Sequence, residues 1–320
     1  MYLSYYELKE EPFRLTPDPH FLHLSEPHQN ALTVLLEGIL YRKGLVMVTG
    51  PIGTGKTTLV HTALEMLTDI SKQKMPIKSA LMFHPTLTRD EFLEMMLEDF
   101  EISCPSTSKP GRLMALHQML LDVQKQGGTA VLFIDEAHLL TSELLEEIRL
   151  LGNADTHREK LLQIVLSGQP ELITMMNRRE LSALQQRIAA RANLRPLSLP
   201  EVRSYIAERL HLAGLQGASP FSPIALDEIL QYSSGVPRLI NLICDACLTL
   251  GFRTQRKTIH QDIVEEVAVS LGLVAPTPAL VEKKSMTFLL DSPASVPSAP
   301  KSIVDSLIES MKRNRETAVR

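Results

Sequence analysis

Apolar residues follow two alternating patterns over the first two hundred positions of this chain. Short, mainly apolar runs predict buried strands at residues 45–48, 79–83, 130–134 and 162–166. Between them, apolar residues three and four positions apart predict amphipathic helices at 26–43, 58–67, 89–100, 113–126 and 142–151. Strands that alternate with helices build a parallel sheet covered by helices on both faces. The pattern therefore predicts an α/β domain over residues 1–196.

The pattern changes after this domain. Only helices are predicted from residue 197 onward, at 200–213, 223–232, 236–252 and 260–271, which gives a small all-α domain over residues 197–272. Residues 273–320 form a third region, in which a Pro/Ser-rich linker, expected to be disordered, leads to a terminal amphipathic helix at 302–315. That helix is either a frayed tail or a docking helix for a partner or a membrane surface.

Composition narrows the class of protein. The chain has 320 residues, 44% of them hydrophobic and 22% charged, with a formal net charge of −4. These values fit a soluble protein of about two domains and argue against a wholly basic nucleic-acid binder. No run of 18 apolar residues predicts a transmembrane helix, and the N-terminus lacks the features of a signal peptide.

The chain has three cysteines, too few for a disulfide framework, so a reducing compartment is expected. Cys244 and Cys247 form a C-x-x-C, but within an apolar helical run and without a second pair. We expect two buried small side chains there rather than a metal or redox site.

The segment between the first strand and the next helix carries the strongest chemical motif. It reads Gly-Pro-Ile-Gly-Thr-Gly-Lys-Thr from Gly50 to Thr57 and matches G-x-x-x-x-G-K-[ST] in full. Glycines let the backbone curl so that successive N–H groups face an anion, and the following helix adds the positive end of its dipole. The alternative is a glycine-rich turn that spells the motif by chance, which the strand–loop–helix context disfavours.

This motif predicts an ATP and Mg²⁺ site. Lys56 is expected to reach the β/γ-phosphates and assist catalysis, and the Thr57 hydroxyl is expected to bind Mg²⁺. The residues expected to line the nucleotide phosphates are Gly50, Pro51, Ile52, Gly53, Thr54, Gly55, Lys56, Thr57 and Thr58.

The third strand runs directly into Asp135 and Glu136, which is the pattern of a Walker B motif. Asp135 is expected to hold Mg²⁺, directly or through water, and Glu136 to orient and activate the attacking water. The string Asp-Glu-Ala-His also raises a DEAH-type helicase as an alternative. That class needs two recombinase-like cores, whereas the second half of this chain is helical and short.

Two further positions are candidate sensors of the nucleotide. Ser167 follows the fourth strand and could sense the γ-phosphate, with Gln169 as the second choice. The alternative is a plain strand-terminating turn. In the helical domain, Gly-Val-Pro-Arg opens a helix, and Arg238 could reach the γ-phosphate from this lid. An ordinary helix start with an exposed arginine is the alternative.

An arginine-rich segment lies between these two sensors. Arg187 and Arg191 are four residues apart, a spacing that predicts one side of a helix. One of them could be a catalytic arginine finger that enters the neighbouring subunit's site. A solvated basic face remains open, as does a DNA-phosphate contact that would also use Arg178, Arg179 and Arg195.

Taken together, these motifs resemble the AAA+ ATPases over about residues 1–272. Walker A, Walker B, a polar sensor, an arginine finger and Gly-x-Pro-Arg occur in the order of that family. A closer resemblance is to the ExeA/GspA-like ATPases of bacterial secretion systems, including a branch associated with exosortase and exopolysaccharide gene clusters. It is carried by Tyr-Tyr-Glu-Leu-Lys-Glu-Glu-Pro-Phe at 5–13, Thr-Pro-Asp-Pro at 16–19, Ser-Gly-Gln-Pro-Glu-Leu at 167–172, Gln-Arg-Ile at 186–188 and Pro-Arg-Leu-Ile-Asn at 237–241.

The resemblance implies an ATP-hydrolysing assembly or regulatory motor. Such a motor would work as a homo-oligomer in the cytoplasm, peripherally at the inner membrane, with a secretion or export protein as partner. Secretion-type members typically add a membrane helix and a peptidoglycan-binding domain; this sequence shows neither, so the shorter, soluble branch is expected. The alternative function is a DNA-binding transposition helper of the MuB/TniB kind. A weaker one is a nucleotide-binding scaffold without turnover, which the intact Glu136 disfavours.

Overall fold

A computed structural model describes residues 2–16, 21, 23–73, 75–83, 86–155 and 159–274, and positions 304, 308 and 309. The chain divides into two compact units. Residues 17–195 form the α/β unit, and residues 1–16 with residues from 196 onward form the helical unit. The sequence-based prediction had instead placed residues 1–16 in the α/β domain.

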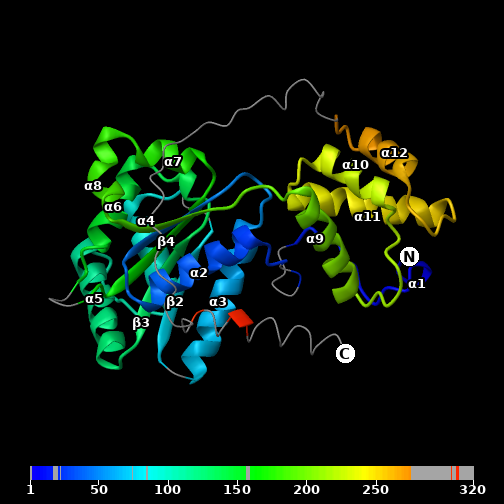
Figure 1. Ribbon diagram of the computed structural model, residues 1–320. Helices are drawn as coiled ribbons and strands as arrows, with labels where there is room; N and C mark the ends of the chain where they lie inside the picture. The colour runs from blue at the N-terminus through cyan, green and yellow to red at the C-terminus, as the bar shows by residue number, and fades with distance from the viewer. Residues whose placement is uncertain are drawn as a thin grey trace, which may run out of the picture. The chain divides into compact units, whose positions relative to one another are not determined.

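The α/β unit contains a five-stranded parallel sheet (Figure 1). Its strands lie in the order β2-β3-β4-β1-β5. They span Leu45–Thr49 for β1, Ile77–Met82 for β2, Thr129–Ile134 for β3, Leu162–Gly168 for β4 and Ile188–Asn193 for β5. The parallel α/β architecture expected from the sequence is confirmed.

Alternate strand residues face opposite layers of helices. Met47, Leu132 and Ile164 belong to a large core shared with α4 (Arg89–Asp99), α5 (Lys109–Lys125), α6 (Ser142–Leu151), α7 (Glu171–Met176) and α8 (Ser182–Gln185). The other face is covered by α2 (Glu26–Leu40) and α3 (Lys56–Gln73). There a Cβ on Gly38 would lie 2.3 Å from the Val46 side chain, so this glycine lets α2 lie close to the sheet. Short 3₁₀ turns occupy Ala137–Leu139 (η2) and Arg179–Leu181 (η3).

The fifth strand corrects a prediction. We expected Arg187 and Arg191 on one side of a helix, which is wrong, because α8 ends at Gln185 and Arg191 lies on β5. The strand pairs with β1 along its length, with Met47 opposite Arg191 and a register shift between Leu45 and Val46. Pairing with a buried neighbour decides the conformation of a segment whose own alanine-rich pattern favours a helix.

The helical unit consists of α9 (Leu199–Leu212), α10 (Pro223–Ser233), α11 (Pro237–Arg253) and α12 (Gln261–Ser270), with the short N-terminal α1 (Tyr2–Tyr5) against α11. Hydrogen bonds explain why the first residues belong here. Tyr2 Oη donates to Asp245 Oδ1 at 2.5 Å, and Arg209 Nε donates to the Pro12 carbonyl at 2.6 Å. The Arg209 side chain is buried, so this bond fastens the N-terminal segment to α9 from within.

Parts of three predictions fall outside the described residues. These are the turn at 17–20, the linker from 275 to 302 and most of the terminal helix. Within that helix the described positions 304, 308 and 309 are helical, and Val304 and Ile308 are buried. Among the described residues, no helix is both long and apolar enough to cross a bilayer.

Candidate nucleotide site

The carboxyl edge of the sheet gathers most of the predicted site residues. The phosphate loop follows β1, Asp135 and Glu136 follow β3, and Ser167 is the penultimate residue of β4. Because β4 lies between β1 and β3, these three segments are neighbours in space. Two backbone hydrogen bonds join these segments. Gly50 N–H donates to the Gly168 carbonyl at 3.2 Å, which links the phosphate loop to β4, and Leu194 N–H donates to the Thr49 carbonyl at 2.7 Å, which links the end of β5 to β1.

The phosphate loop has the backbone that an anion cradle requires. Gly53 and Gly55 adopt φ of +78° and +94°, a region that side-chain-bearing residues rarely enter. A Cβ on Gly50 would lie 2.8 Å from the Leu194 carbonyl oxygen, so the loop entrance has room only for glycine. The loop ends where α3 begins, at Lys56, so its N–H groups and the helix dipole meet at one point.

Lys56 is held inside this loop. Its Nζ donates to the carbonyls of Gly50 at 2.8 Å and Pro51 at 3.0 Å, and its side chain is buried. Burial lowers the pKa of the ammonium below its usual value, while the carboxylates of Glu136, Asp135 and Glu171 partly oppose that shift. The ammonium is therefore short of solvation, and a phosphate oxygen would supply an additional negative partner.

The expected metal ligands lie in contact with one another. Thr57 Oγ1 donates to Asp135 Oδ2 at 2.7 Å, which joins the start of α3 to the end of β3. The second carboxylate oxygen of Asp135 accepts the Glu136 N–H at 2.9 Å, and the side chain is buried. A hydroxyl and a carboxylate at this spacing are oxygen ligands of the kind that Mg²⁺ prefers.

Three buried side-chain atoms of the described residues lack a hydrogen-bond partner, and all three lie at this edge. They are Glu136 Oε2, His138 Nδ1 and Ser167 Oγ. His138 Nδ1 is 3.3 Å from Glu136 Oε2, which is ion-pair distance without hydrogen-bond geometry. Glu136 also has φ of +51°, a left-handed conformation uncommon for glutamate. Unpaired buried polar atoms usually indicate an absent water or ligand, so this cluster fits a nucleotide and its attacking water.

The remaining predicted residues lie elsewhere or have no side-chain contact that decides their role. Gln169 directly follows β4 and is half-buried, and Thr58 lies in the first turn of α3. Arg238 is exposed in the first turn of α11, in the helical unit. Arg187 precedes the amino end of β5, where Nη1 donates to the Arg149 carbonyl at 2.8 Å.

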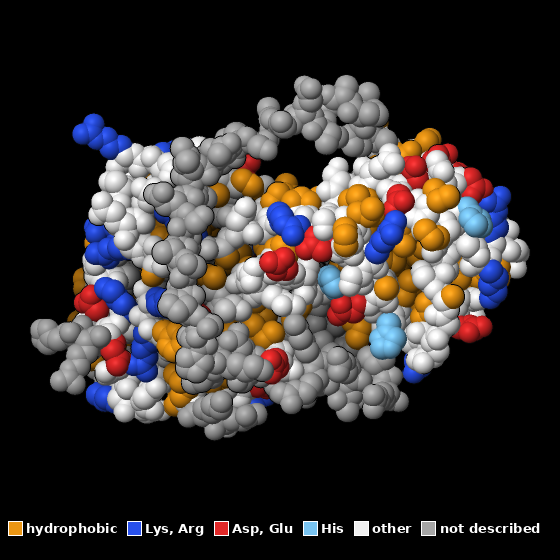
Figure 2. Space-filling view, in the orientation of Figure 1, with side chains coloured by type: hydrophobic (Ala, Val, Ile, Leu, Met, Phe, Trp, Pro, Cys, Tyr) orange, Lys and Arg blue, Asp and Glu red, His pale blue; other side chains and the backbone are white. Residues whose placement is uncertain are grey.

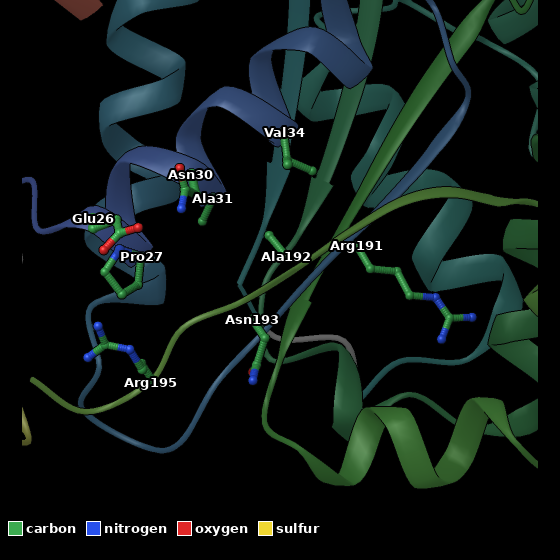
Figure 3. Close-up of a pocket in the computed structure, with 9 residues that line it drawn as sticks. All are labelled: Glu26, Pro27, Asn30, Ala31, Val34, Arg191, Ala192, Asn193 and Arg195. Atoms are coloured by element: carbon green, nitrogen blue, oxygen red, sulfur yellow. The ribbon is translucent and has the colours of Figure 1, made fainter. Parts of the chain in front are cut away.

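Arg191 instead borders a hollow between α2 and β5 (Figure 3). Its guanidinium extends away from α2, whereas Glu26, Asn30 and Asn193 lie around the hollow. Thr49 Oγ1 lies 3.4 Å from Asn193 Oδ1, so the hollow adjoins the residue directly ahead of the phosphate loop.

Sequence reasoning missed three side chains at or beside the phosphate loop. His28, at the start of α2, contacts the loop backbone, Ser25 contacts His28, and His138 contacts Glu136. A pattern-based clue existed for His28, which is three and four residues before Ala31 and Leu32 and so shares their buried face. Of the C-x-x-C prediction, the burial of the two small side chains is confirmed, since the Cys244 and Cys247 thiols are both buried.

Comparisons with known proteins agree with this geometry. A family model described as an AAA domain matches residues 39–176. General secretion pathway protein A of Aeromonas hydrophila is 39% identical over 268 residues, which cover 82% of this chain and 47% of that protein. An uncharacterized HTH-type transcriptional regulator of Methanocaldococcus jannaschii is 24% identical over 72% of this chain and 56% of its own length. The chain thus spans about half the length of the curated relatives it matches.

Solved structures share the fold. A chain of the Drosophila ORC bound to DNA aligns with a TM-score of 0.65 at 17% identity, over 85% of this chain and 66% of its own. Cdc6p from Pyrobaculum aerophilum aligns with a TM-score of 0.60 at 16% identity, over 80% and 71%. At such identities the similarity establishes the fold alone.

Proposed function

Because this chain belongs to the AAA+ ATPases, in the ExeA/GspA-like family, we propose that it binds ATP with Mg²⁺ and hydrolyses the terminal phosphoanhydride bond. The observation that carries the proposal is the cluster of unpaired buried atoms on Glu136, His138 and Ser167 beside a complete phosphate loop. A terminal phosphate and an attacking water would supply the missing partners.

Each residue then has a definite task. Lys56 and the N–H groups of the loop hold the β/γ-phosphates, and Mg²⁺, when bound, neutralises charge on the phosphate oxygens. Thr57 and Asp135 would hold that ion. Glu136 orients the water and accepts its proton, and Ser167 donates a hydrogen bond toward the γ-phosphate, with Gln169 as the alternative sensor. Arg238 would report on the γ-phosphate from the helical unit.

We further propose that hydrolysis requires more than one copy of the chain. In a parallel sheet all strands begin at one edge and end at the opposite edge. Ile188, the first residue of β5, pairs with Leu45 at the start of β1, so Arg187 lies at the edge opposite the phosphate loop. Arg187 is therefore separated from its own phosphate loop by the length of β1, about 15 Å at ~3.3 Å per residue. As an arginine finger it would serve the site of a neighbouring copy, in a ring or filament. Arg191, exposed on β5, is the second candidate.

The cellular role that the relatives support is a nucleotide-driven assembly or regulatory ATPase of a bacterial secretion or surface-export system. The similarity to General secretion pathway protein A carries this step. We place the work at the cytoplasmic face of the inner membrane, with an export protein as partner.

A DNA-binding helper ATPase is the second candidate. Arg178, Arg179 and Arg191 are exposed and have no ion pair within the described part of the chain. Two of the structures that share the fold, a Drosophila ORC and an Aeropyrum pernix ORC1, are complexes with DNA. On the face seen in Figure 2, however, Lys and Arg side chains are interspersed with Asp and Glu, which favours the first proposal.

One experiment separates these functions. We would measure ATP hydrolysis per subunit against protein concentration, with and without double-stranded DNA, and use Lys56→Ala as the inactive control. A rate that rises steeply with concentration and ignores DNA supports a self-assembling motor. Strong stimulation by DNA, with a binding affinity that falls steeply with salt, would replace it by the helper function. ATP binding that survives in Lys56→Ala would refute the proposed site.

A further inference from the structure

A buried histidine at the start of α2 contacts the phosphate loop. His28 is 3% exposed, and its Nε2 lies 2.9 Å from the carbonyl oxygen of Thr54. On the other side of the ring, Nδ1 lies 2.6 Å from Ser25 Oγ, and Ser25 is itself buried. The three residues form a hydrogen-bonded chain from the N-cap position of α2 to the middle of the loop.

The chemistry of the partners fixes the direction of these bonds. A carbonyl oxygen only accepts, so His28 Nε2 must carry a proton and donate it to Thr54. In the neutral ring Nδ1 is then the acceptor, and the Ser25 hydroxyl donates to it. Ser25 thereby selects the tautomer that the loop requires, in the way that an outer partner orients a metal-bound histidine.

The bond to Thr54 controls the orientation of a phosphate-binding amide. In a trans peptide the C=O and the following N–H point in opposite directions. Because the Thr54 carbonyl points toward His28, the N–H of Gly55 is turned away from α2. Rotation of this peptide changes φ of Gly55, and a glycine backbone offers little steric resistance to such a change, so the bond to His28 favours one orientation. His28 also lies directly against Gly55, where a Cβ would be 3.3 Å from Nε2.

We propose that His28 is a positioning residue that presets the Thr54–Gly55 peptide for phosphate, with Ser25 fixing the histidine tautomer. The inference rests on the proposed nucleotide function and extends it, since it adds a residue outside the glycine motif to the phosphate site. Preorganised amides bind an anion without first being reoriented, so His28 contributes to affinity for the phosphates while it touches no ligand.

The test is a matched pair of variants, His28→Gln and His28→Asn. Both carry a primary amide, but the glutamine side chain is longer by one methylene, and only its amide N–H reaches as far as Nε2 does. We expect His28→Gln to bind ADP and ATP within about threefold of wild type and His28→Asn to bind about tenfold more weakly, a change of about 1.4 kcal/mol. Ser25→Ala should show a smaller loss in the same direction. His117→Ala, at an exposed position on α5, is the control and should bind as wild type does.

Hydrogen–deuterium exchange without nucleotide gives a second measurement. We expect faster exchange in His28→Asn at residues 50–58 and unchanged exchange in β3 and β4. Equal affinity and equal loop exchange for the two variants would overturn the inference while the nucleotide function stands. Faster exchange throughout the α/β unit would also overturn it, because His28 would then stabilise the fold in general. Failure of the wild-type protein to bind nucleotide would instead refute the proposed function.

Discussion

Replacing Gly235, the buried glycine in the turn ahead of α11, should strongly destabilise the helical unit. Gly235 has φ of +73°, and a Cβ added there would lie 2.1 Å from the Leu197 carbonyl oxygen. The Gly235 carbonyl also accepts the Leu197 N–H at 2.8 Å, so two backbone segments are in direct contact. Neither can yield by rotating a side chain.

The cost of Gly235→Ala follows from three contributions. The left-handed conformation costs an alanine about 1–2 kcal/mol, and the overlap with backbone costs about 1–3 kcal/mol. Loss of the hydrogen bond from Leu197 adds about 1 kcal/mol. We expect the free energy of unfolding of the helical unit to fall by about 3–6 kcal/mol, which lowers its Tm by more than about 10 °C.

Calorimetry and circular dichroism on the full chain would measure this change, and two glycines of the same unit provide controls. Gly272 has φ of +67° but no neighbour within 4 Å of its added Cβ, so Gly272→Ala reports the torsional cost alone. Gly217 has neither feature, and Gly217→Ala should change the free energy of unfolding by less than about 0.5 kcal/mol. If Gly235→Ala is no more destabilising than Gly272→Ala, the contact with Leu197 does not have the effect assigned to it.

Three further predictions concern the site and the cysteines. Glu136→Gln should retain ATP binding and lose at least about 100-fold in turnover, because the water loses its base; a retained rate in single-turnover assays would contradict this. Lys56→Ala and Arg187→Ala proteins, each inactive alone, should regain a fraction of the wild-type rate when mixed, because Arg187→Ala keeps an intact phosphate loop and Lys56→Ala keeps an intact arginine. No recovery at high concentration would exclude Arg187 as the finger. In native protein at pH 8, a thiol reagent should modify only Cys104, because burial raises the pKa of Cys247 to about 12 and that of Cys244 well above its usual value; rapid loss of all three thiols would contradict the buried C-x-x-C.

Local chemistry explains how much of the site could be predicted from sequence. The phosphate loop needs glycines, a lysine and a hydroxyl within eight positions, so the motif from Gly50 to Thr57 can be identified without knowledge of the tertiary structure. Asp135 could be placed beside them because parallel strands of one sheet end at a common edge. The helices of the helical unit begin and end within a few residues of their expected bounds. Ser198, Ser222 and three helix-opening prolines mark the starts of three of them.

The features that sequence reasoning missed depend on contacts between distant positions. Within the described part of the chain, β5 pairs with β1 alone, and its residues 190–193 alternate alanine with polar residues. Its conformation therefore depends on β1, more than 130 positions earlier. The N-terminal segment is held to the helical unit by a hydrogen bond between Tyr2 and Asp245, and no sequence pattern within residues 1–16 predicts that partner. The bond of His28 to Thr54 spans 26 positions and was invisible for the same reason.

In the proposed mechanism, the nucleotide-binding residues and the arginine finger lie at opposite edges of the sheet, so one active site needs residues from two copies of the chain. Every strand is parallel, so Lys56, Asp135 and Ser167 must share the carboxyl edge, and whatever precedes β5 must lie at the amino edge. Arg187 is oriented there by the α6 carbonyl of Arg149, a backbone atom that does not depend on any bound nucleotide. An arginine held in this way by a rigid element can complete a neighbouring site only when two copies are in register. Oligomer assembly would then control hydrolysis through the geometry of the sheet, without a conformational change in the site itself.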